Sequence, residues 1–367
     1  MSEALSNTGN RLLLFLHSEK LNSDTSQNII LENYGISNNE IDIVTYKSKI
    51  KRGIELGIAF SALAFFIKDL IRGDAPNSII SRNIYGAFFL GLLMRKNVVY
   101  ETHIPEIGFR GYLQNALISS KKIQTVVISQ ALKKIIMGDK HMLNEKIHVF
   151  HDAARADRPN LDLLQRKKLQ EQFLGSIPCL NSYEKIIGYF GHLYAGRGID
   201  IIQGLAAKHP NYAFIVYGGN EKEIQIFLDG NLSENLFFMG HLNQNQIFKR
   251  MAMMEVLLMP YQRTVSIGLE SVDTVKWMSP MKMFEYMSAA VPIISSDLPV
   301  LREVLVDLHN CILVEPDNID EWSNALKKLS NSPELNKKLS SNSYKDYLTE
   351  YTWNIRAQRM LALFPFN

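Results

Sequence analysis

The segment SPMKMFEYMSAAVPIISSD (residues 279–297) contains a helix and the strand that follows it. Ser279 is a residue type that caps helices and Pro280 suits a first helical turn, so the sequence predicts a helix from this pair to Ala290. The apolar run PIISS, at residues 292–296, has the length and β-branched character of a buried strand. A helix that leads directly into a buried strand is typical of an α/β protein with a parallel sheet.

Short apolar runs and longer amphipathic runs alternate in the same way along the rest of the chain. The second half is predicted to contain further strands at residues 185–190, 212–218, 236–239, 256–261 and 311–316. The first half is predicted to contain strands at residues 11–17, 40–46, 78–81, 97–102, 125–129 and 146–150, with a long helix at residues 52–72. Strands that alternate with helices form βαβ units, so the sequence predicts parallel sheets covered on both faces.

Two α/β series account for the length of 367 residues, which corresponds to about two domains. Between them, residues 158–184 contain two prolines, polar clusters and no clean strand, as expected of an interdomain connection. We therefore predict a first lobe at residues 1–165, a connection at 166–184, a second lobe at 185–350 and a terminal helix at 351–367. Ligands bind at the carboxyl ends of such strands, so the site is expected in a cleft between the lobes.

The composition argues against several classes of protein. With 40 Lys and Arg residues against 37 Asp and Glu residues, the formal net charge is only +3, which is not typical of a nucleic-acid-binding protein. Two cysteines, Cys179 and Cys311, are too few for a disulfide framework or a Cys-rich metal site, and the cytoplasm is the expected compartment. The polar start lacks the layout of a signal peptide.

The longest apolar run, residues 58–67, is about half the length of a membrane-spanning helix. It follows a group of basic residues, Lys47, Lys49, Lys51 and Arg52. Basic residues beside an apolar helix can dock on anionic lipid. The alternative is a buried helix with a solvated basic end, which is the commoner arrangement.

The start of the predicted helix at residue 279 is suited to phosphate. Backbone N–H groups and the positive end of the helix dipole meet at such a terminus. Glu285 lies about a turn and a half into the helix, where its carboxylate can accept hydrogen bonds from two vicinal hydroxyls, as on a ribose. A surface glutamate on an ordinary helix fits the same spacing equally well.

The segment GYFGHLYAGRGID (residues 188–200) follows the first predicted strand of the second lobe. Gly191, Gly196 and Gly198 make a flexible loop there, and Arg197 lies within it. A guanidinium on a glycine-rich loop suits a diphosphate, although a tight turn with a solvated arginine explains the same residues. The loop is not the dinucleotide fingerprint G-x-G-x-x-G.

Together these motifs resemble the donor-binding lobe of glycosyltransferase family 4, the retaining GT-B transferases that use sugar nucleotides. The resemblance is carried by SPMKMFEYMSAAVPIISSDLPVLREVL (residues 279–305), GHLYAGRGID (191–200), IVYGG (215–219), NLFFMGHL (235–242) and YTWNIRAQRM (351–360). In the first lobe it rests on VVYETH (98–103), VVISQALKK (126–134) and HVFHDAA (148–154). It implies an α/β GT-B fold of two Rossmann-like lobes that face a central cleft, with the C-terminal helix crossing back onto the first lobe.

The resemblance also implies roles for individual residues. Glu285 would hold the ribose hydroxyls of the donor, Arg197 would neutralise its diphosphate, and His103 would reach the donor sugar and stabilise the transition state. Lys282 is a further phosphate candidate, or else an outward-facing helix residue. The other implied donor contacts are Gly191, His192, Gly218, His241, Leu242 and the backbone groups of Ser279, Pro280 and Met281.

Two positions depart from the family pattern. Its paired glutamates, E-x7-E, require a carboxylate where Trp277 stands, which puts the sugar-contacting side of the site in question. His192 occupies a position where arginine is common, and its contribution to phosphate binding depends on its protonation. The loop at residues 265–278 is expected to shape the choice of donor sugar.

The residues favour catalysis without a metal ion or another cofactor. The chain contains no Asp-x-Asp, and placed cations with a helix dipole can stabilise a departing diphosphate instead. His148 and His151 have a possible metal-ligand spacing but no carboxylate or cysteine partner at a suitable distance in sequence, and we interpret them as the end of a strand.

We predict a retaining glycosyltransferase that moves a sugar from a UDP- or GDP-linked donor to a hydroxyl of a glycan or lipid-linked acceptor. The expected setting is polysaccharide or lipopolysaccharide synthesis in the cytoplasm, at the inner face of the membrane, with no nucleic-acid partner. One alternative is a sugar-nucleotide epimerase of GT-B architecture, with Glu101 and Glu106 as candidate acid and base. Another, motivated by Trp277, is a noncatalytic subunit.

Overall fold

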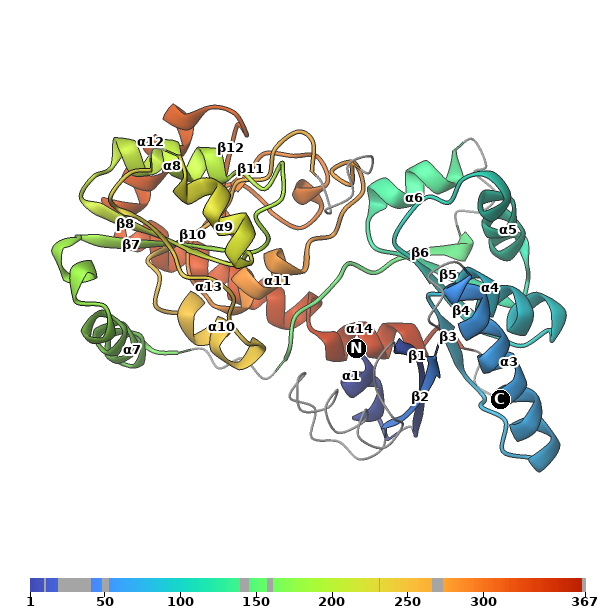
Figure 1. Cartoon of the computed structure of the whole chain (residues 1–367). Helices are drawn as coiled ribbons and strands as arrows, with labels where there is room; N and C mark the ends of the chain where they lie inside the picture. The colour runs from blue at the N-terminus through green and yellow to red at the C-terminus, as the bar shows by residue number, and fades with distance from the viewer. Residues whose placement is uncertain are drawn as a thin grey trace. The chain divides into compact units, whose positions relative to one another are not determined.

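A computed structural model of the chain describes residues 1–9, 11–18, 41–47, 53–138, 145–156, 161–230, 232–265 and 273–364. Its contacts divide the chain into two compact units (Figure 1). The first unit comprises Met1–His151 together with Trp353–Asn367, and the second comprises Asp152–Thr352. The chain therefore leaves the first unit before the predicted boundary at residue 165.

The second unit is built on a parallel sheet of six strands in the order β12-β11-β10-β7-β8-β9. The chain runs outward from β7 to β9 and resumes on the other side of β7 at β10, so the strand order reverses between β7 and β10. All six strands predicted for this half are confirmed. They are β7 (Lys185–Phe190), β8 (Tyr212–Tyr217), β9 (Leu236–Phe238), β10 (Val256–Met259), β11 (Ile293–Ser296) and β12 (Ile312–Val314).

Helix α12 (Ile319–Ser330) illustrates how apolar spacing builds the core of this unit. Trp322, Ala325, Leu326 and Leu329 recur at helical spacing and are all buried in one cluster with side chains of β8 and β10. The other helices of the unit are α7 (Leu163–Ser176), the 3-10 helix η3 (Pro178–Ser182), α8 (Ile199–Lys208), α9 (Glu221–Leu228), α10 (Gln244–Met251), α11 (Met281–Ser288), the 3-10 helix η4 (Leu301–Glu303) and α13 (Pro333–Glu350).

The segment predicted as a connection is largely helical and packs on the second unit. Arg166 of α7 donates through Nη2 to the carbonyl oxygen of Ala289 at 2.8 Å. Phe173 of the same helix is buried, and the guanidinium of Arg250 lies 4.7 Å from its ring centroid. These contacts make α7 part of the second unit rather than a bare linker.

The first unit contains two separately hydrogen-bonded parallel sheets within its described residues. Strands β1 (Leu12–Ser18) and β2 (Ile41–Lys47) form one, and β3 (Ile79–Ser81), β4 (Val98–Thr102), β5 (Ile123–Val127) and β6 (Ile147–Val149) form the other, in that order. The six strands predicted for this half are confirmed. The helices are α1 (Ser2–Ser6), α3 (Ile54–Arg72), α4 (Ile84–Ala87), the π-helix η1 (Phe88–Leu93), α5 (Gly108–Ser119) and α6 (Gln130–Met137).

The C-terminal helix α14 (Trp353–Leu361) belongs to the first unit, beside α1 in Figure 1. Met360 and the following Phe364 are buried with Val99 of β4 and Val126 of β5. The burial of this apolar surface stabilises the packing of α14 on the strands of the first unit.

Met360→Ala is expected to lower the free energy of unfolding by about 2–5 kcal/mol, because the fully buried side chain leaves a cavity against β4 and β5. Gln358→Ala, at an exposed position of the same helix, is the matched control and should change it by less than about 0.5 kcal/mol. Urea unfolding followed by circular dichroism measures both; equal stability of the two variants would contradict this packing.

Candidate functional site

The loops that follow β7 and β10 touch through their backbones at the carboxyl edge of the second sheet. A Cβ atom on Gly196 would lie 1.9 Å from the carbonyl oxygen of Thr264, and one on Gly198 would lie 1.8 Å from that of Pro260. The amide of Gln262 donates to the carbonyl oxygen of Gly196 at 2.9 Å. The glycines thus serve close packing at the reversal of strand order, where open α/β sheets bind ligands. These contacts pack the predicted glycine loop closely against the loop that follows β10.

The loops after β8 and β9 join this edge. Gly218 has a φ of +127°, and a Cβ atom there would lie 1.9 Å from the carbonyl oxygen of Gly191. Its amide donates to the carbonyl oxygen of Gly240 at 2.8 Å. His241 and Leu242, predicted to lie near the nucleobase, follow directly, and His241 is exposed.

Lys282 is the most unusual side chain of the site, because its ammonium group lies in an aromatic cage. The residue is 9% exposed, and Nζ lies 4.2 Å from the ring centroid of Tyr189 and 4.5 Å from that of Tyr261. Among the described residues Nζ has no hydrogen-bond partner. Burial lowers the pKa of Lys282 well below its usual range, and the positive charge of Arg197 lowers it further. The interpretation of Lys282 as an outward-facing residue is therefore wrong.

Arg197 brings a second cation to the same aromatic group. Its Nη1 donates to the hydroxyl of Tyr261 at 2.9 Å, and its guanidinium carbon lies 5.1 Å from the centroid of that ring. Tyr261 is fully buried, and burial raises the pKa of its phenol, so the ring remains neutral between the two cations. Two basic groups beside one buried ring can serve as a receptor for an anion, and the carboxylate of Glu285 is close enough to oppose the lowering of the Lys282 pKa.

Helix α11 carries Lys282 and, one turn later, the half-buried Glu285. Tyr286 holds this helix on the sheet: its hydroxyl accepts from the amide of Phe190 at 2.8 Å and donates to the carbonyl oxygen of Leu258 at 3.2 Å. Because Phe190 ends β7 and Leu258 lies in β10, the start of α11 is positioned where the strand order reverses.

The start of α11 differs in one respect from the prediction. Pro280 occupies the N-cap and Met281 the first helical position, and no side chain caps the helix. The predicted capping by Ser279 is wrong, because its Oγ accepts from the amide of Asp152 at 3.0 Å and so ties down the chain that enters this unit. The amide of Met283 donates to the carbonyl oxygen of Pro280 at 2.9 Å, and no side chain satisfies the first turn.

His192 does not supply the cation that an arginine would supply at its position. The ring is exposed and stacks on Tyr194, with centroids 4.9 Å apart and planes 2° from parallel. Partial burial and the charge of Arg197 lower the pKa of His192 below its ordinary value, which leaves it neutral at pH 7. Half of the predicted sugar-selecting loop, residues 266–272, lies outside the described residues.

His103 lies in the first unit, whereas the other predicted site residues lie in the second. It follows β4 directly, and its Nε2 lies 2.8 Å from Oε1 of Glu101. Glu101 is 2% exposed and also accepts from Arg82 and Arg356. Burial by itself would raise the pKa of Glu101, but the hydrogen bond with His103 and the two arginine charges hold it well below its usual range.

His148 and His151 turn to different partners. His148 bonds Gln124, and His151 bonds the carbonyl oxygen of Ile128. Nowhere in the described part of the chain do three His, Cys, Asp or Glu side chains gather as a metal site requires.

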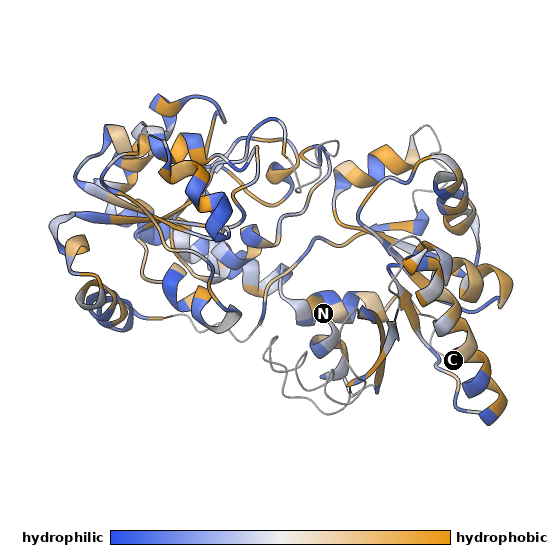
Figure 2. Ribbon diagram, in the orientation of Figure 1, coloured by the Kyte–Doolittle hydropathy of each residue, from blue (hydrophilic) through white to orange (hydrophobic). Residues whose placement is uncertain are grey.

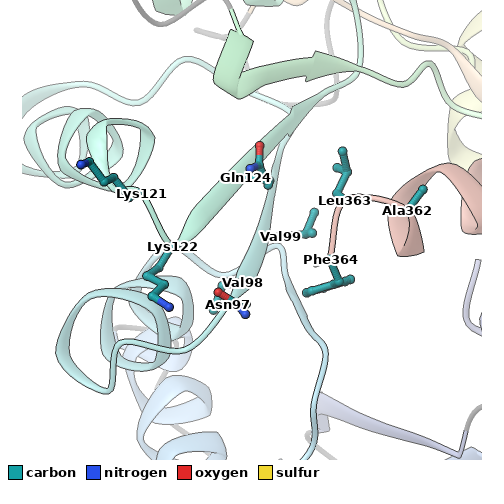
Figure 3. Close-up of a pocket in the computed structure, with 9 residues that line it drawn as sticks. All are labelled: Asn97, Val98, Val99, Lys121, Lys122, Gln124, Ala362, Leu363 and Phe364. Atoms are coloured by element: carbon teal, nitrogen blue, oxygen red, sulfur yellow. The ribbon is translucent and has the colours of Figure 1, made fainter. Parts of the chain in front are cut away.

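A pocket of about 360 Å³ in the first unit is not part of this chemistry (Figure 3). Asn97, Lys121 and Lys122 line it and lie just before β4 and β5, and Phe364 closes one side. It therefore lies at the amino ends of the strands, the opposite edge from the ends at which ligands of parallel sheets bind.

Comparison with known proteins agrees with the geometry of the second unit. Residues 178–346 match the family model "Glycosyl transferases group 1". The match lies within the second unit and supports a transferase enzyme. The O-antigen chain mannosyltransferase RfbU of Salmonella typhimurium is 21% identical over 259 residues, 69% of this chain and 62% of the relative, so the chain spans less than two thirds of that protein.

Two solved structures share the fold of the whole chain, including its first unit. Sucrose-phosphate synthase from Thermosynechococcus elongatus superposes with a TM-score of 0.70 at 13% identity, covering 99% of this chain and 90% of that one. HepE from Anabaena in complex with UDP superposes with a TM-score of 0.67 at 14% identity, covering 96% and 98%. The predicted GT-B fold of two parallel-sheet α/β lobes is confirmed.

Sequence reasoning missed the residues that surround the predicted ones. Tyr189 and Tyr261 lie at the ends of predicted strands, and a tyrosine at a carboxyl strand end is a signal that could have marked them as site residues. Arg356 carried no such signal, since it is 255 positions from Glu101, the carboxylate that it contacts.

Lys282→Met is expected to raise the free energy of unfolding by about 1–3 kcal/mol, because an amine buried without a hydrogen-bond partner is replaced by an apolar side chain of similar length. Lys249→Met, at an exposed position of α10, is the matched control and should be neutral. Urea unfolding without ligand gives the comparison; a destabilised Lys282→Met would mean that the protein itself satisfies the ammonium.

Proposed function

We propose that the chain is a glycosyltransferase that binds a nucleotide-diphosphate sugar in the second unit and passes the sugar to an acceptor hydroxyl. The observation that carries the proposal is the pair of cations, Lys282 and Arg197, on one buried tyrosine at the carboxyl edge of the sheet. A diphosphate is the anion that fits two adjacent basic groups and the uncapped start of α11. The likeness to the mannosyltransferase RfbU and to HepE, which was solved in complex with UDP, supports this choice.

The proposed chemistry places charge where these groups lie. The bond between the anomeric carbon of the sugar and the diphosphate oxygen breaks as the acceptor oxygen bonds to that carbon, and the proton of the acceptor hydroxyl passes to the departing diphosphate. Lys282 and Arg197 stabilise the negative charge that the departing oxygen gains. Glu285 accepts hydrogen bonds from the ribose hydroxyls, and His103 contacts the donor sugar. We propose that the reaction requires no metal ion and retains the anomeric configuration.

The alternative of an epimerase is disfavoured by the two carboxylates that it would need. Glu101 is held ionised by three basic partners, so it cannot supply a proton. Glu106 accepts two hydrogen bonds from Arg110, at 2.6 Å each. Trp277 remains the one argument for a noncatalytic subunit, and a turnover assay decides it.

We further propose that the acceptor is lipid-linked and that the first unit meets an anionic membrane surface. Helix α3 is largely apolar along its length (Figure 2). Its exposed apolar residues recur along one stripe at helical spacing, and Phe60 is 53% and Ile71 82% exposed. The stripe consists of Leu56, Phe60, Ala64, Ile67 and Ile71. Lys68 and Arg72 are exposed near its end, with Asp69 between them.

A second exposed apolar group lies close to His103 in sequence. Ile107, Phe109 and Tyr112 are each more than 70% exposed and occupy the loop and helix start that follow β4. Arg110 forms an ion pair with Glu55, which joins the start of α5 to the start of α3. The two apolar groups thus border one another, and a lipid-borne hydroxyl that arrived there would be close to the strand end that carries His103.

The basic segment before α3 and the length of the apolar helices both bear on a membrane contact. The side chains of Lys47, Lys49, Lys51 and Arg52 lie outside the described residues. Within the described part of the chain, no helix is both long and apolar enough to cross a bilayer.

Arg197→Ala and Glu285→Ala are each expected to weaken the binding of UDP or GDP about 10- to 100-fold, the loss of about 1.5–3 kcal/mol that removal of a charge-assisted hydrogen bond causes. Isothermal titration with UDP, GDP and their glucose and mannose conjugates identifies the base and measures the losses. Arg263→Ala, which removes an exposed arginine paired with Glu315 and Asp317, should bind as the unchanged protein does. The donor site is wrongly assigned if both site variants bind the nucleotide with full affinity and hydrolyse the donor at the same slow rate as the unchanged protein.

Nucleotide binding is expected to take up a proton. The pKa of Lys282 is lowered in the free protein, and a diphosphate beside it favours the charged form, so binding raises that pKa toward its ordinary value. Titrations in two buffers of different ionisation enthalpy, repeated over a range of pH, should show net proton uptake at pH values between the lowered and the ordinary pKa of Lys282. The same titrations on Lys282→Met subtract the ionisation of the nucleotide itself; equal uptake by both proteins would refute the coupling.

Phe60→Ser combined with Ile67→Ser is expected to release the protein from vesicles of anionic phospholipid, because it removes two exposed apolar side chains from the α3 stripe. Leu228→Ser, at a 52% exposed position of the second unit, is the matched control and should leave binding unchanged. Co-sedimentation at low and moderate salt measures both. Reversal of the charge of Lys47, Lys49, Lys51 and Arg52 tests the basic segment in the same assay, and binding that survives both changes would exclude this surface.

A further inference from the structure

Glu101 is a buried carboxylate at the carboxyl end of β4 that gathers three basic side chains on one oxygen. Its Oε1 lies 2.7 Å from Nη2 of Arg82, 2.8 Å from Nε2 of His103 and 3.1 Å from Nη2 of Arg356. Arg356 is as deeply buried as the carboxylate, with 2% of each side chain exposed. A buried carboxylate with this set of partners remains ionised and can only accept hydrogen bonds.

The ionised carboxylate decides which nitrogen of His103 carries a proton. Because Glu101 accepts, Nε2 must donate, and the neutral ring then has Nδ1 as its acceptor. The His103 side chain is 34% exposed, so it is anchored at one nitrogen and partly open to solvent. A sugar hydroxyl that met this ring would donate to Nδ1.

Arg356 in turn fixes the carboxylate. Its Nε donates to the carbonyl oxygen of His151 at 2.9 Å, and its Nη2 reaches that of Phe150 at 3.2 Å. Its guanidinium carbon lies 5.7 Å from the ring centroid of Trp353. The C-terminal helix thus contacts β4 through a charge as well as through the apolar residues that bury Met360.

We propose that Glu101 is a positioning residue that sets the orientation and the Nε2–H tautomer of His103, and that Arg356 of α14 holds this carboxylate in place. The inference rests on the proposed function in one respect only, namely that His103 contacts the donor sugar. Glu101 itself touches neither the donor nor the acceptor in this arrangement.

The tautomer is tested without any substrate. Protein labelled with ¹⁵N-histidine, with the His103 signals assigned by their loss in His103→Asn, reports the protonated nitrogen through long-range ¹H–¹⁵N couplings. A proton on Nε2 in the neutral ring is expected, and a proton on Nδ1 alone would overturn the proposal. This measurement needs only the unchanged protein and the His103→Asn variant, whose substituted side chain is partly exposed. It therefore does not depend on how well a Glu101 variant folds.

The positioning role is tested by a double-mutant cycle of donor turnover. Glu101→Gln keeps the shape but removes the charge, and it is expected to lower kcat about 10- to 100-fold, as loss of a carboxylate that orients a histidine does elsewhere, with less effect on the KM for the donor. In a His103→Ala background the same change should cost less than about threefold, since its target is already absent. An undiminished loss in that background would show a merely structural role.

Two controls separate this inference from the proposed function. Asp42→Asn removes an exposed carboxylate paired with Arg11 in the same unit and should leave turnover unchanged. If His103→Ala keeps full turnover, the proposed contact of His103 with the sugar fails, whereas the ¹⁵N spectrum still decides whether Glu101 sets the tautomer. A spectrum with the Nδ1–H form defeats the inference even if the protein transfers sugar.

Discussion

The close contact between the loops that follow β7 and β10 is the constraint on which the site of the second unit depends. Gly196 and Gly198 lie against backbone carbonyl groups at distances that leave no room for a side chain. This packing sets the position of Arg197, which stands between the two glycines, and of Tyr261, which follows β10. The aromatic ring that both cations share is therefore a consequence of backbone packing at the point where the strand order reverses.

The burial of Lys282 has a cost in stability that binding of the proposed ligand would offset. An amine without a hydrogen-bond partner destabilises the fold by the desolvation of a polar group, and tyrosine rings compensate for that only in part. The same desolvation leaves a strong, water-excluded interaction for an anion that enters. The helix that carries Lys282 is held by Tyr286 on two neighbouring strands, so the amine cannot turn to solvent without loss of those contacts.

The first unit uses the opposite electrostatic arrangement. Its buried charge is a carboxylate surrounded by basic groups, and the partners come from the residues that directly follow β3 and β4 and from the C-terminal helix. Such a group keeps its charge when buried because three basic side chains surround one of its oxygens. The result is that Nε2 of His103 is anchored by the buried carboxylate, and exposed apolar residues follow the histidine in the next loop.

Local patterns in the sequence determined the strands, most helices and the positions of Glu285 and Arg197, because period and loop composition depend on near neighbours. From the sequence alone, Ser279 was predicted to cap the helix. Whether Lys282 faces the sheet or the solvent was left undecided, since charged residues are mostly exposed. Only the tertiary structure decided that the Lys282 side of α11 faces the sheet, that Ser279 binds the chain at Asp152, and that Arg356 meets Glu101. These are contacts between segments far apart in sequence, and burial, which decides the chemistry of each charge, exists only once those segments pack.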